Sequence, residues 1–309
     1  MVRLASLLGG LVSLAAIVTA TPVPAELETL ALEAPELEPA ELEARAVATL
    51  GRSNDWSCTS TVHPNPVILL HGLFASEKLD LNFVEAWLRN KGFCTFALLY
   101  GSSTPKLPIL GGIKPVAESS LEVAAFIREV HNRTGADKVD IVGHSEGGFQ
   151  GLYVTKFHGV APLVDQIIAI ASPTHGTDVS GLYKIAYLFG KFSYDAIKNL
   201  LATVGCGACN DFAVDGAAVS RLNDGKPIVQ PGNTVTIIAS RYDEIVTPAT
   251  TAFVQEPGVH NIFVQDYCPL DPVGHLGVSV DLNVWRLVLN SLERKIGRKF
   301  FCLLGPPGR

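Results

Sequence analysis

The sequence lacks the common motifs that hold a cofactor. Its 309 residues contain no phosphate-binding P-loop, no dinucleotide-binding glycine fingerprint and no clustered metal ligands. Charged residues are also scarce, at 17%, against 48% hydrophobic residues, which is too apolar a composition for general disorder. No internal repeat is visible. We therefore expect one large folded domain that uses no cofactor.

Most of the chain has no excess of positive or negative charge. Residues 21–46 hold seven Glu, four Pro and one Arg, and their net charge of −6 equals that of the whole chain. Without this stretch and Arg3, 22 basic residues face 23 acidic ones. This balance indicates no nucleic-acid partner and no anionic membrane surface. We interpret residues 21–46 as an acidic propeptide or linker.

The first 20 residues have the layout of a secretory signal peptide. They contain one arginine, an apolar run and a small-residue end. The alternative is a membrane anchor, but the apolar run is short and no basic stop-transfer cluster follows it. We therefore expect a secreted, extracellular protein with no integral membrane span, and a folded domain at residues 47–309.

Six cysteines agree with an oxidising compartment and suggest disulfides, although spacing alone cannot choose among the pairings. The close pair Cys206 and Cys209 could suggest a zinc or redox motif, but it lacks a second close pair. The single glycosylation sequon, "NRT", begins at Asn132, just past a predicted helix.

Short β-branched and apolar runs alternate with stretches of helical periodicity. Continuous apolar strands separated by helices predict an α/β fold whose mostly parallel sheet is flanked by helices on both faces. In such sheets, ligands bind beyond the carboxyl ends of the strands. Strands are predicted at 66–72, 94–100, 138–144, 165–172, 233–240 and 260–266, and helices at 116–135, 146–159 and 282–295.

One motif marks a candidate nucleophile. Residues 143–147, "GHSEG", match the pattern G-x-S-x-G around Ser145. The pattern alone is weak, and an ordinary turn is the alternative. Here a predicted strand ends at Val142 and a predicted helix begins near Glu146, which is the strand–turn–helix context that a nucleophile elbow needs.

A serine nucleophile requires a base after it in the sequence. His275 fits best, because "CPLDPVGHLG" places it in a loop after the last predicted strand and before the last helix. The alternative is a structural loop histidine. The other histidines fit less well: His158 lies on the helix behind the nucleophile, His175 precedes any suitable acid, and His260 begins a strand.

The acid that orients this base should follow an earlier strand. The stretch "TVTIIASRYDEIVTP" presents Asp243 close to its strand end, with Glu244 as the fallback. Asp271 is only four residues before His275 and is interpreted as a turn residue. Asp178, in the loop after "IAIASPTHGT", is a weaker rival.

Backbone N–H groups should stabilise the oxyanion of a tetrahedral intermediate. One donor is expected at Glu146, directly after the nucleophile. The other is expected in the loop after an early strand, where Leu73 follows His71 and Gly72 in "LLHGLFAS". His71 would shape this turn and not act as a catalyst itself.

Together these motifs resemble a known family. "HGLFAS", "GHSEGG", "IASPTHGT", "SRYDEIVTP" and "VQDYCPLDPVGHLG" occur in the order seen in secreted class 2 triacylglycerol lipases of the α/β-hydrolase fold, and more distantly in the lipase B type. The resemblance spans about residues 56–302. It implies Ser145, Asp243 and His275 as a triad with Leu73 and Glu146 as oxyanion donors. It also implies the disulfide pairs Cys58–Cys94, Cys206–Cys209 and Cys268–Cys302.

Residues 181–210 form a long, aromatic and apolar segment. It predicts either a lid over the acyl site or a pair of amphipathic helices that cover the core. In the lid interpretation, the residues facing lipid are Leu182, Tyr183, Ile185, Tyr187, Leu188 and Phe189.

The expected function is hydrolysis of acylglycerol-type esters, with an acyl ester or lipid as the partner and a transient lipid interface. An acyltransferase, a lactone or polar-ester esterase, and a non-catalytic binding protein are the alternatives.

Overall fold

The computed structural model describes residues 52–103, 110–178 and 205–306. Within them, the strands form one six-stranded sheet in which every neighbouring pair is parallel, in the order β2-β1-β3-β4-β5-β6. This confirms the predicted fold class. The strands are β1 Val67–Leu70, β2 Thr95–Ala97, β3 Val139–His144, β4 Val164–Ile170, β5 Thr234–Ala239 and β6 His260–Phe263.

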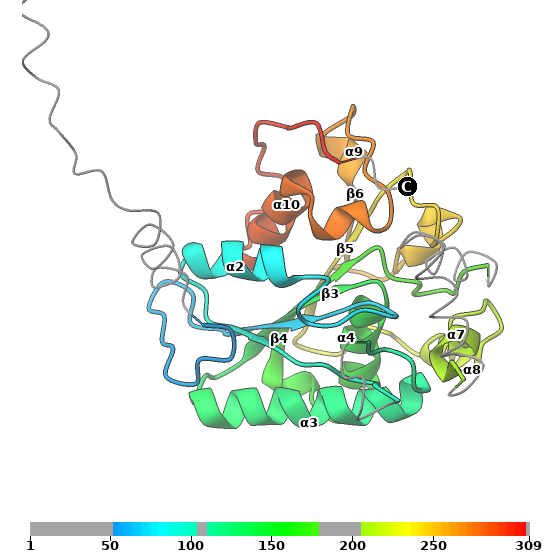
Figure 1. The fold of residues 1–309 in the computed structure, drawn as a ribbon, viewed down its shortest axis with the longest axis horizontal. Coiled ribbons are helices and arrows are strands. Elements are labelled where there is room, and N and C mark those ends of the chain that lie inside the picture. Colours follow the sequence, from blue (N-terminus) through cyan, green and yellow to red (C-terminus); the bar gives the residue numbers. More distant parts are fainter. Residues whose placement is uncertain (1–51, 104–109, 179–204, 307–309) are drawn as a thin grey trace, which may run out of the picture. The chain divides into compact units, whose positions relative to one another are not determined.

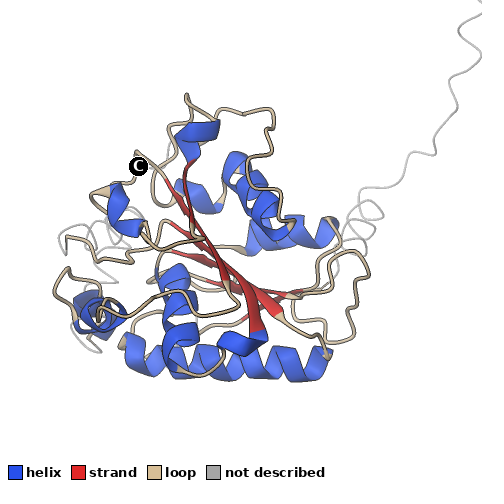
Figure 2. Cartoon of the chain, turned by 180° about the vertical axis from the view of Figure 1, so that it is seen from behind, coloured by secondary structure: helices blue, strands red, loops and turns tan. Residues whose placement is uncertain are grey.

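Helices cover both faces of this sheet (Figure 1 and Figure 2). Helices α3 (Val116–Thr134) and α4 (Glu146–Phe157) pack on one face, and α2 (Asn82–Asn90) and α10 (Leu282–Leu292) pack on the other. Successive side chains of a strand point to opposite faces. In β1, Ile68 and Leu70 accordingly belong to the α3–α4 core, and Val67 and Leu69 to the α2–α10 core. Burial on both faces explains why the strands are continuous apolar runs.

Each predicted strand and helix runs one to three residues past the observed element at one or both ends, and for the last strand and the last helix the structure shows where the element stops. The last strand ends at Phe263, not at residue 266, because Asp266 accepts a hydrogen bond from the Phe263 N–H and the short helix α9 (Val264–Tyr267) begins there. The last helix ends at Leu292, three residues before the predicted end. Its start is fixed by Asp281, whose carboxylate accepts hydrogen bonds from the N–H groups of Asn283 and Val284.

Several short elements complete the described part of the chain. They are η2 Ala161–Leu163, α7 Gly207–Asp211, α8 Ala217–Leu222, η3 Ala249–Ala252 and η4 Gly277–Ser279. The close cysteine pair lies at the start of one of these helices, α7. Cys206 precedes α7, its sulfur accepts a hydrogen bond from the Cys209 N–H, and Cys209 is buried in the core.

All six cysteines form disulfides, in the pairing implied by the family resemblance: Cys58–Cys94, Cys206–Cys209 and Cys268–Cys302. Asn132 is exposed and lies inside the last turn of α3, not beyond the helix.

Three predictions lie outside the described residues: the signal peptide at 1–20, the propeptide or linker at 21–46, and the six lipid-facing residues between 182 and 189. Of the predicted lid, residues 205–210 are described, and they include all but the last residue of the core-packed helix α7. Within the described ranges, no helix is long and apolar enough to cross a bilayer. No group of three or more His, Cys, Asp or Glu residues there is arranged to hold a metal ion.

Candidate active site

Ser145 occupies a strained turn between β3 and α4. Its backbone has φ 53° and ψ −118°, a region that a residue with a side chain rarely adopts. Two hydrogen bonds hold the turn: the Ser145 N–H donates to the Ile170 carbonyl at 2.8 Å, and the Ser172 hydroxyl donates to the Ser145 carbonyl at 2.9 Å. The turn therefore has the strand–elbow–helix geometry expected from the sequence.

The glycines beside Ser145 are required by close backbone approach. A methyl group at Gly143 would collide with the backbone of Gly147 and Gly148, and one at Gly147 would collide with the Leu70 carbonyl. The turn is thus packed against the end of β1 with no space for side chains at these two positions. This packing supplies the free energy that keeps Ser145 in its strained conformation.

The structure places His275 against Ser145. The His275 Nε2 atom lies 3.0 Å from the Ser145 hydroxyl oxygen, and its Nδ1 atom lies 2.9 Å from Asp243 Oδ2. With the Nδ1 proton donated to the carboxylate, Nε2 is free to accept the serine proton. Ser145 and His275 are 6% and 1% exposed, so these contacts are made in a nearly dry environment.

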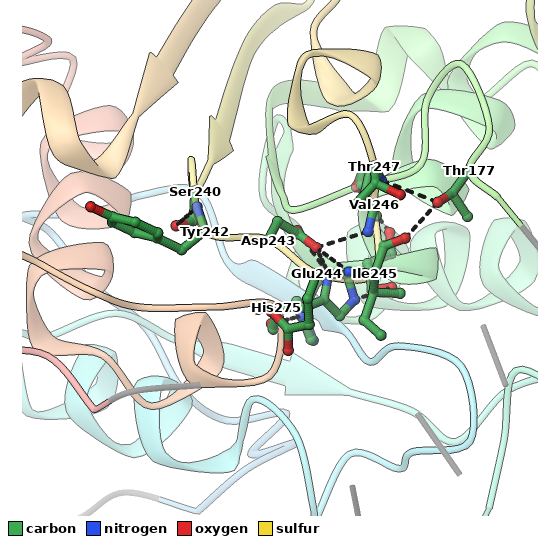
Figure 3. A network of polar contacts seen from close by, with 12 residues as sticks. Thr177, Ser240, Tyr242, Asp243, Glu244, Ile245, Val246, Thr247 and His275 are labelled. Carbon is green, nitrogen blue, oxygen red and sulfur yellow. Dashed lines mark hydrogen bonds and ion pairs between the residues drawn. The ribbon is translucent and has the colours of Figure 1, made fainter. Parts of the chain in front are cut away.

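Asp243 is itself fixed by the loop after β5 (Figure 3). Its Oδ1 accepts hydrogen bonds from the N–H groups of Ile245 and Val246, at 2.9 and 2.8 Å. The Thr177 hydroxyl donates to the Ile245 carbonyl and accepts from the Thr247 N–H, which joins this loop to the segment after β4. The carboxylate therefore faces His275 in one orientation.

The rival acids have other partners. Glu244 accepts a hydrogen bond from the His275 backbone N–H at 3.1 Å, so it positions the loop of the base and not the ring. Asp271 accepts from the Val273 N–H and from the Asn283 side chain, consistent with a turn residue. Asp178 is exposed, near the end of a described range.

Of the other histidines that the sequence offered, three have rings that contact groups other than the Ser145 hydroxyl. The ring of His158 contacts the Ser120 hydroxyl, and the ring of His175 contacts the Thr251 carbonyl. His260 is the exposed first residue of β6. His71 stacks on Tyr100, with ring centroids 4.3 Å apart, and its ring also contacts the Gly72 carbonyl. His71 thus shapes the turn after β1, which is the part the sequence suggested for it.

The two backbone segments that carry the expected oxyanion donors, Leu73 and Glu146, meet next to Ser145. Leu73 follows the turn after β1, and Glu146 is the first residue of α4, whose early N–H groups have no partner within the helix. Neither the Leu73 N–H nor the Glu146 N–H donates a hydrogen bond to another described residue. A methyl group at Gly72 would lie 3.2 Å from the Ser145 Cβ, so the two segments are in contact at the nucleophile.

A second acid–histidine pair, which no sequence pattern predicted, lies behind this site. Both carboxylate oxygens of Asp80 lie 2.9 Å from His144 Nδ1, and the His144 Nε2 lies 3.0 Å from the His275 carbonyl oxygen. Asp80 also accepts a hydrogen bond from the Gly72 N–H at 2.7 Å. The pair therefore connects the turn after β1, the nucleophile elbow and the loop of the base.

Each member of this pair favours the charged form of the other. Burial lowers the pKa of His144, but the Asp80 carboxylate and its hydrogen bonds have the larger effect, so the pKa is raised overall. Burial raises the pKa of Asp80, but the charge and hydrogen bonds of His144 and the Gly72 N–H lower it overall. Both directions favour a buried ion pair. The only sequence signal was the histidine in G-H-S-E-G.

Comparison with known proteins supplies the family context for this geometry. A model of the "alpha/beta hydrolase fold" family matches residues 65–206, which include β1, β3 and the elbow. The chain has the α/β-hydrolase fold. Two solved structures agree with it. Aspergillus fumigatus lipase B superposes with a TM-score of 0.56 at 19% identity, covering 81% of this chain and 57% of that one. Bacillus licheniformis lipase BlEst2 in its mature form gives 0.52 at 15% identity, covering 79% and 95%.

Among sequence relatives, a triacylglycerol lipase of Pseudarthrobacter phenanthrenivorans is 33% identical over 140 residues, or 43% of this chain and 37% of the relative. A triacylglycerol lipase of Pseudomonas fragi is 22% identical over 127 residues, or 41% and 40%. The match thus spans less than half the length of these curated relatives. The hydrolase-fold chain is distantly related to lipases, which confirms the resemblance at that level.

Proposed function

We propose that this α/β-hydrolase-fold chain is a secreted serine hydrolase that cleaves carboxylic esters of the acylglycerol type through an acyl-serine intermediate. One observation carries the proposal. The Ser145 hydroxyl, the His275 ring and the Asp243 carboxylate form a continuous line of hydrogen-bond contacts beside two backbone N–H groups that have no partner among the described residues. The relatives named as triacylglycerol lipases support the ester class, and the three disulfides support secretion.

The acylation step follows from this geometry. His275 Nε2 accepts the proton of Ser145 as the serine oxygen bonds to the ester carbonyl carbon. The carbonyl oxygen gains the negative charge, and the N–H groups of Leu73 and Glu146 stabilise it. Asp243 stabilises the positive charge on the His275 ring. The ring then gives its proton to the alcohol oxygen as the carbon–oxygen bond breaks and the alcohol leaves.

Deacylation repeats these steps with water. His275 takes a proton from a water molecule whose oxygen attacks the acyl carbon of the Ser145 ester. The same two N–H groups stabilise the second oxyanion. Its collapse releases the fatty acid and returns the proton to the Ser145 oxygen, so the enzyme is regenerated.

Covalent labelling tests this proposal and separates it from a non-catalytic binding protein. We expect a serine-directed alkyl phosphonate to add one label per chain, on the Ser145 peptide, as detected by mass spectrometry of the digest. Ser145→Ala should take no label, while an exposed-serine variant, Ser57→Ala, should label normally. Failure of the wild-type chain to label at Ser145 would contradict the enzyme proposal.

A further measurement addresses the ester class. Hydrolysis rates are measured on short- and long-chain acylglycerols, with and without an oil–water interface. A rate that rises at the interface with long chains supports action on lipids. Activity confined to soluble short-chain esters would leave the serine mechanism and contradict the acylglycerol assignment.

A further inference from the structure

The side chain of Glu146 is a buried acid that the proposed mechanism does not use. The residue is 0% exposed, although it follows the nucleophile directly. Its Oε1 accepts one hydrogen bond, from the Gln150 side-chain amide at 3.2 Å. Its Oε2 is buried and has no hydrogen-bond partner in the part of the chain that the structure describes. A carboxylate usually needs several donors when buried, so this environment suits the neutral acid better.

The unpartnered oxygen lies against the segment that carries the second oxyanion donor. A methyl group built on Gly112 would collide with Glu146 Oε2 and would also lie 3.1 Å from the Leu73 Cα. The Glu146 carboxyl group and the Leu73 backbone are therefore close neighbours around Gly112. The same residue thus places its N–H at the oxyanion site and its carboxyl group behind it.

The groups that face this carboxyl provide no compensating positive charge. Asp211 at the end of α7 contributes a like charge. Tyr100, after β2, is close enough for its own pKa to be raised by burial and then by Glu146. From the same helix, Gln150 supplies a neutral amide. No Lys, Arg or His is among the causes that shift Glu146, so within the described residues nothing cationic offsets its burial.

The net effect of these surroundings is to raise the pKa of Glu146. Burial has the largest effect and raises the pKa of Glu146 well above its usual 4.5; the hydrogen bond from Gln150 lowers it by less, and the Asp211 charge adds a smaller rise. The N-terminus of α4 favours a carboxylate, but that effect is modest compared with the loss of hydration.

We propose that Glu146 is a positioning residue held as a neutral carboxylic acid behind the oxyanion site, and that its ionisation sets the alkaline limit of activity. The proposal rests on the proposed function. When the carboxyl group loses its proton to solvent, a negative charge arises next to the point where the substrate oxygen becomes negative. Repulsion between the two charges weakens the transition state relative to the free substrate.

The alkaline limb of the pH profile tests the proposal. We measure kcat/KM on a soluble short-chain ester from pH 6 to pH 10, with each profile normalised to its own value at pH 7. In the wild-type chain we expect the alkaline side to fall by about tenfold to a hundredfold, which is less than the roughly hundredfold to thousandfold loss that removal of one oxyanion donor causes. Glu146→Gln, which cannot ionise, should remove that fall. An unchanged alkaline limb in Glu146→Gln would overturn the proposal.

Two further variants separate charge from structure. Asp211→Asn removes the like charge, which lowers the pKa of Glu146, so its alkaline limb should move to lower pH. Structural damage would not be expected to remove the alkaline limb in Glu146→Gln and also to move it to lower pH in Asp211→Asn. The control is Glu118→Gln, which makes the same change at an exposed residue in the first turn of α3 and should leave the limb in place. A limb that moves in the control as well would contradict the assignment to Glu146.

Urea unfolding tests the charge state without reference to catalysis. A carboxyl group whose folded-state pKa is raised contributes most to stability below its unfolded pKa, and that contribution is lost as the pH rises toward the folded value. From about pH 5 upward, the unfolding constant of the wild-type chain should therefore rise by up to about tenfold per pH unit relative to Glu146→Gln. Parallel curves would refute the neutral acid. If the curves diverge but the wild-type chain neither labels at Ser145 nor hydrolyses any ester, the proposed function has failed and not the charge assignment.

Discussion

Ser145 combines two demands in one residue. Its hydroxyl must reach His275, and its N–H and carbonyl are both used by the elbow. A non-glycine residue in a sparsely populated region of φ and ψ costs about 1–3 kcal/mol. That strain is tolerated because Gly143 and Gly147 let the turn pack tightly on β1. The strained backbone is therefore part of how the hydroxyl is aimed.

The three proposed catalytic residues should differ in how much activity they control. Ser145→Ala and His275→Ala remove the nucleophile and the base, and kcat should fall by about 10⁴-fold or more. Asp243→Asn should lower kcat somewhat less. The asparagine amide still lies beside Nδ1 of His275, but it no longer provides the negative charge that stabilises the protonated ring. Steady-state ester hydrolysis checks all three variants.

His175→Ala is the matched control for this series. His175 also follows a strand, but its ring contacts the Thr251 carbonyl and not Ser145. Its loss should change kcat by only a few-fold. If His175→Ala were as damaging as His275→Ala, with circular dichroism showing an intact fold, the choice of base would be wrong.

At the scale of elements, Asp80 and His144 join three loops that carry separate parts of the site. Breaking a buried ion pair by removing one partner typically costs about 3–5 kcal/mol. We expect Asp80→Asn to lower the free energy of unfolding by about 3 kcal/mol near pH 6, as measured by urea denaturation. Activity should fall too, since Gly72 and the His275 loop lose a shared partner.

The pH dependence of that loss follows from the signs of the two shifts. The raised pKa of His144 stabilises fully below its unfolded value, about 6.5, and this contribution is lost as the pH rises through the folded value. The lowered pKa of Asp80 stabilises above its unfolded value, about 3.9, and is lost in acid. The difference between wild type and Asp80→Asn should thus be largest at about pH 4–6.5.

Asp266→Asn provides the comparison for this prediction. Asp266 also forms an ion pair, with Arg241, but both side chains are about half exposed, and such pairs contribute about 0–1 kcal/mol. A loss in Asp266→Asn equal to that in Asp80→Asn would show that burial of the pair is not what stabilises it.

At the scale of the molecule, the disulfides differ in how much chain they close. Cys58–Cys94 and Cys268–Cys302 join residues 36 and 34 apart, whereas Cys206–Cys209 joins residues 3 apart. Loop-closure entropy gives about 4 kcal/mol for the long loops and about 2 for the short one. Replacing Cys58 and Cys94 by Ala should therefore lower the unfolding free energy more than replacing Cys206 and Cys209, in the same urea assay. Equal losses would contradict the entropic account.

The sequence predicts the sheet well because its strands are buried on both faces. Such strands read as continuous apolar runs, and each proposed triad residue follows one of them. Helix α2 was not predicted: it is short, and Leu81 before it makes no side-chain cap. Asp80 could not be paired with His144 either, because they are 64 residues apart and only the packing of α2 on the sheet brings them together.

The position of Asn132 has a practical consequence for handling the protein. Helix α3 ends at Thr134, shortly before β3 begins at Val139, while Ser145 follows the far end of the same strand. Anything attached at position 132, whether a sugar chain or a linker to a solid support, therefore emerges at the end of the strand opposite the proposed ester-binding site. Immobilisation through position 132 would leave the proposed active site accessible to solvent.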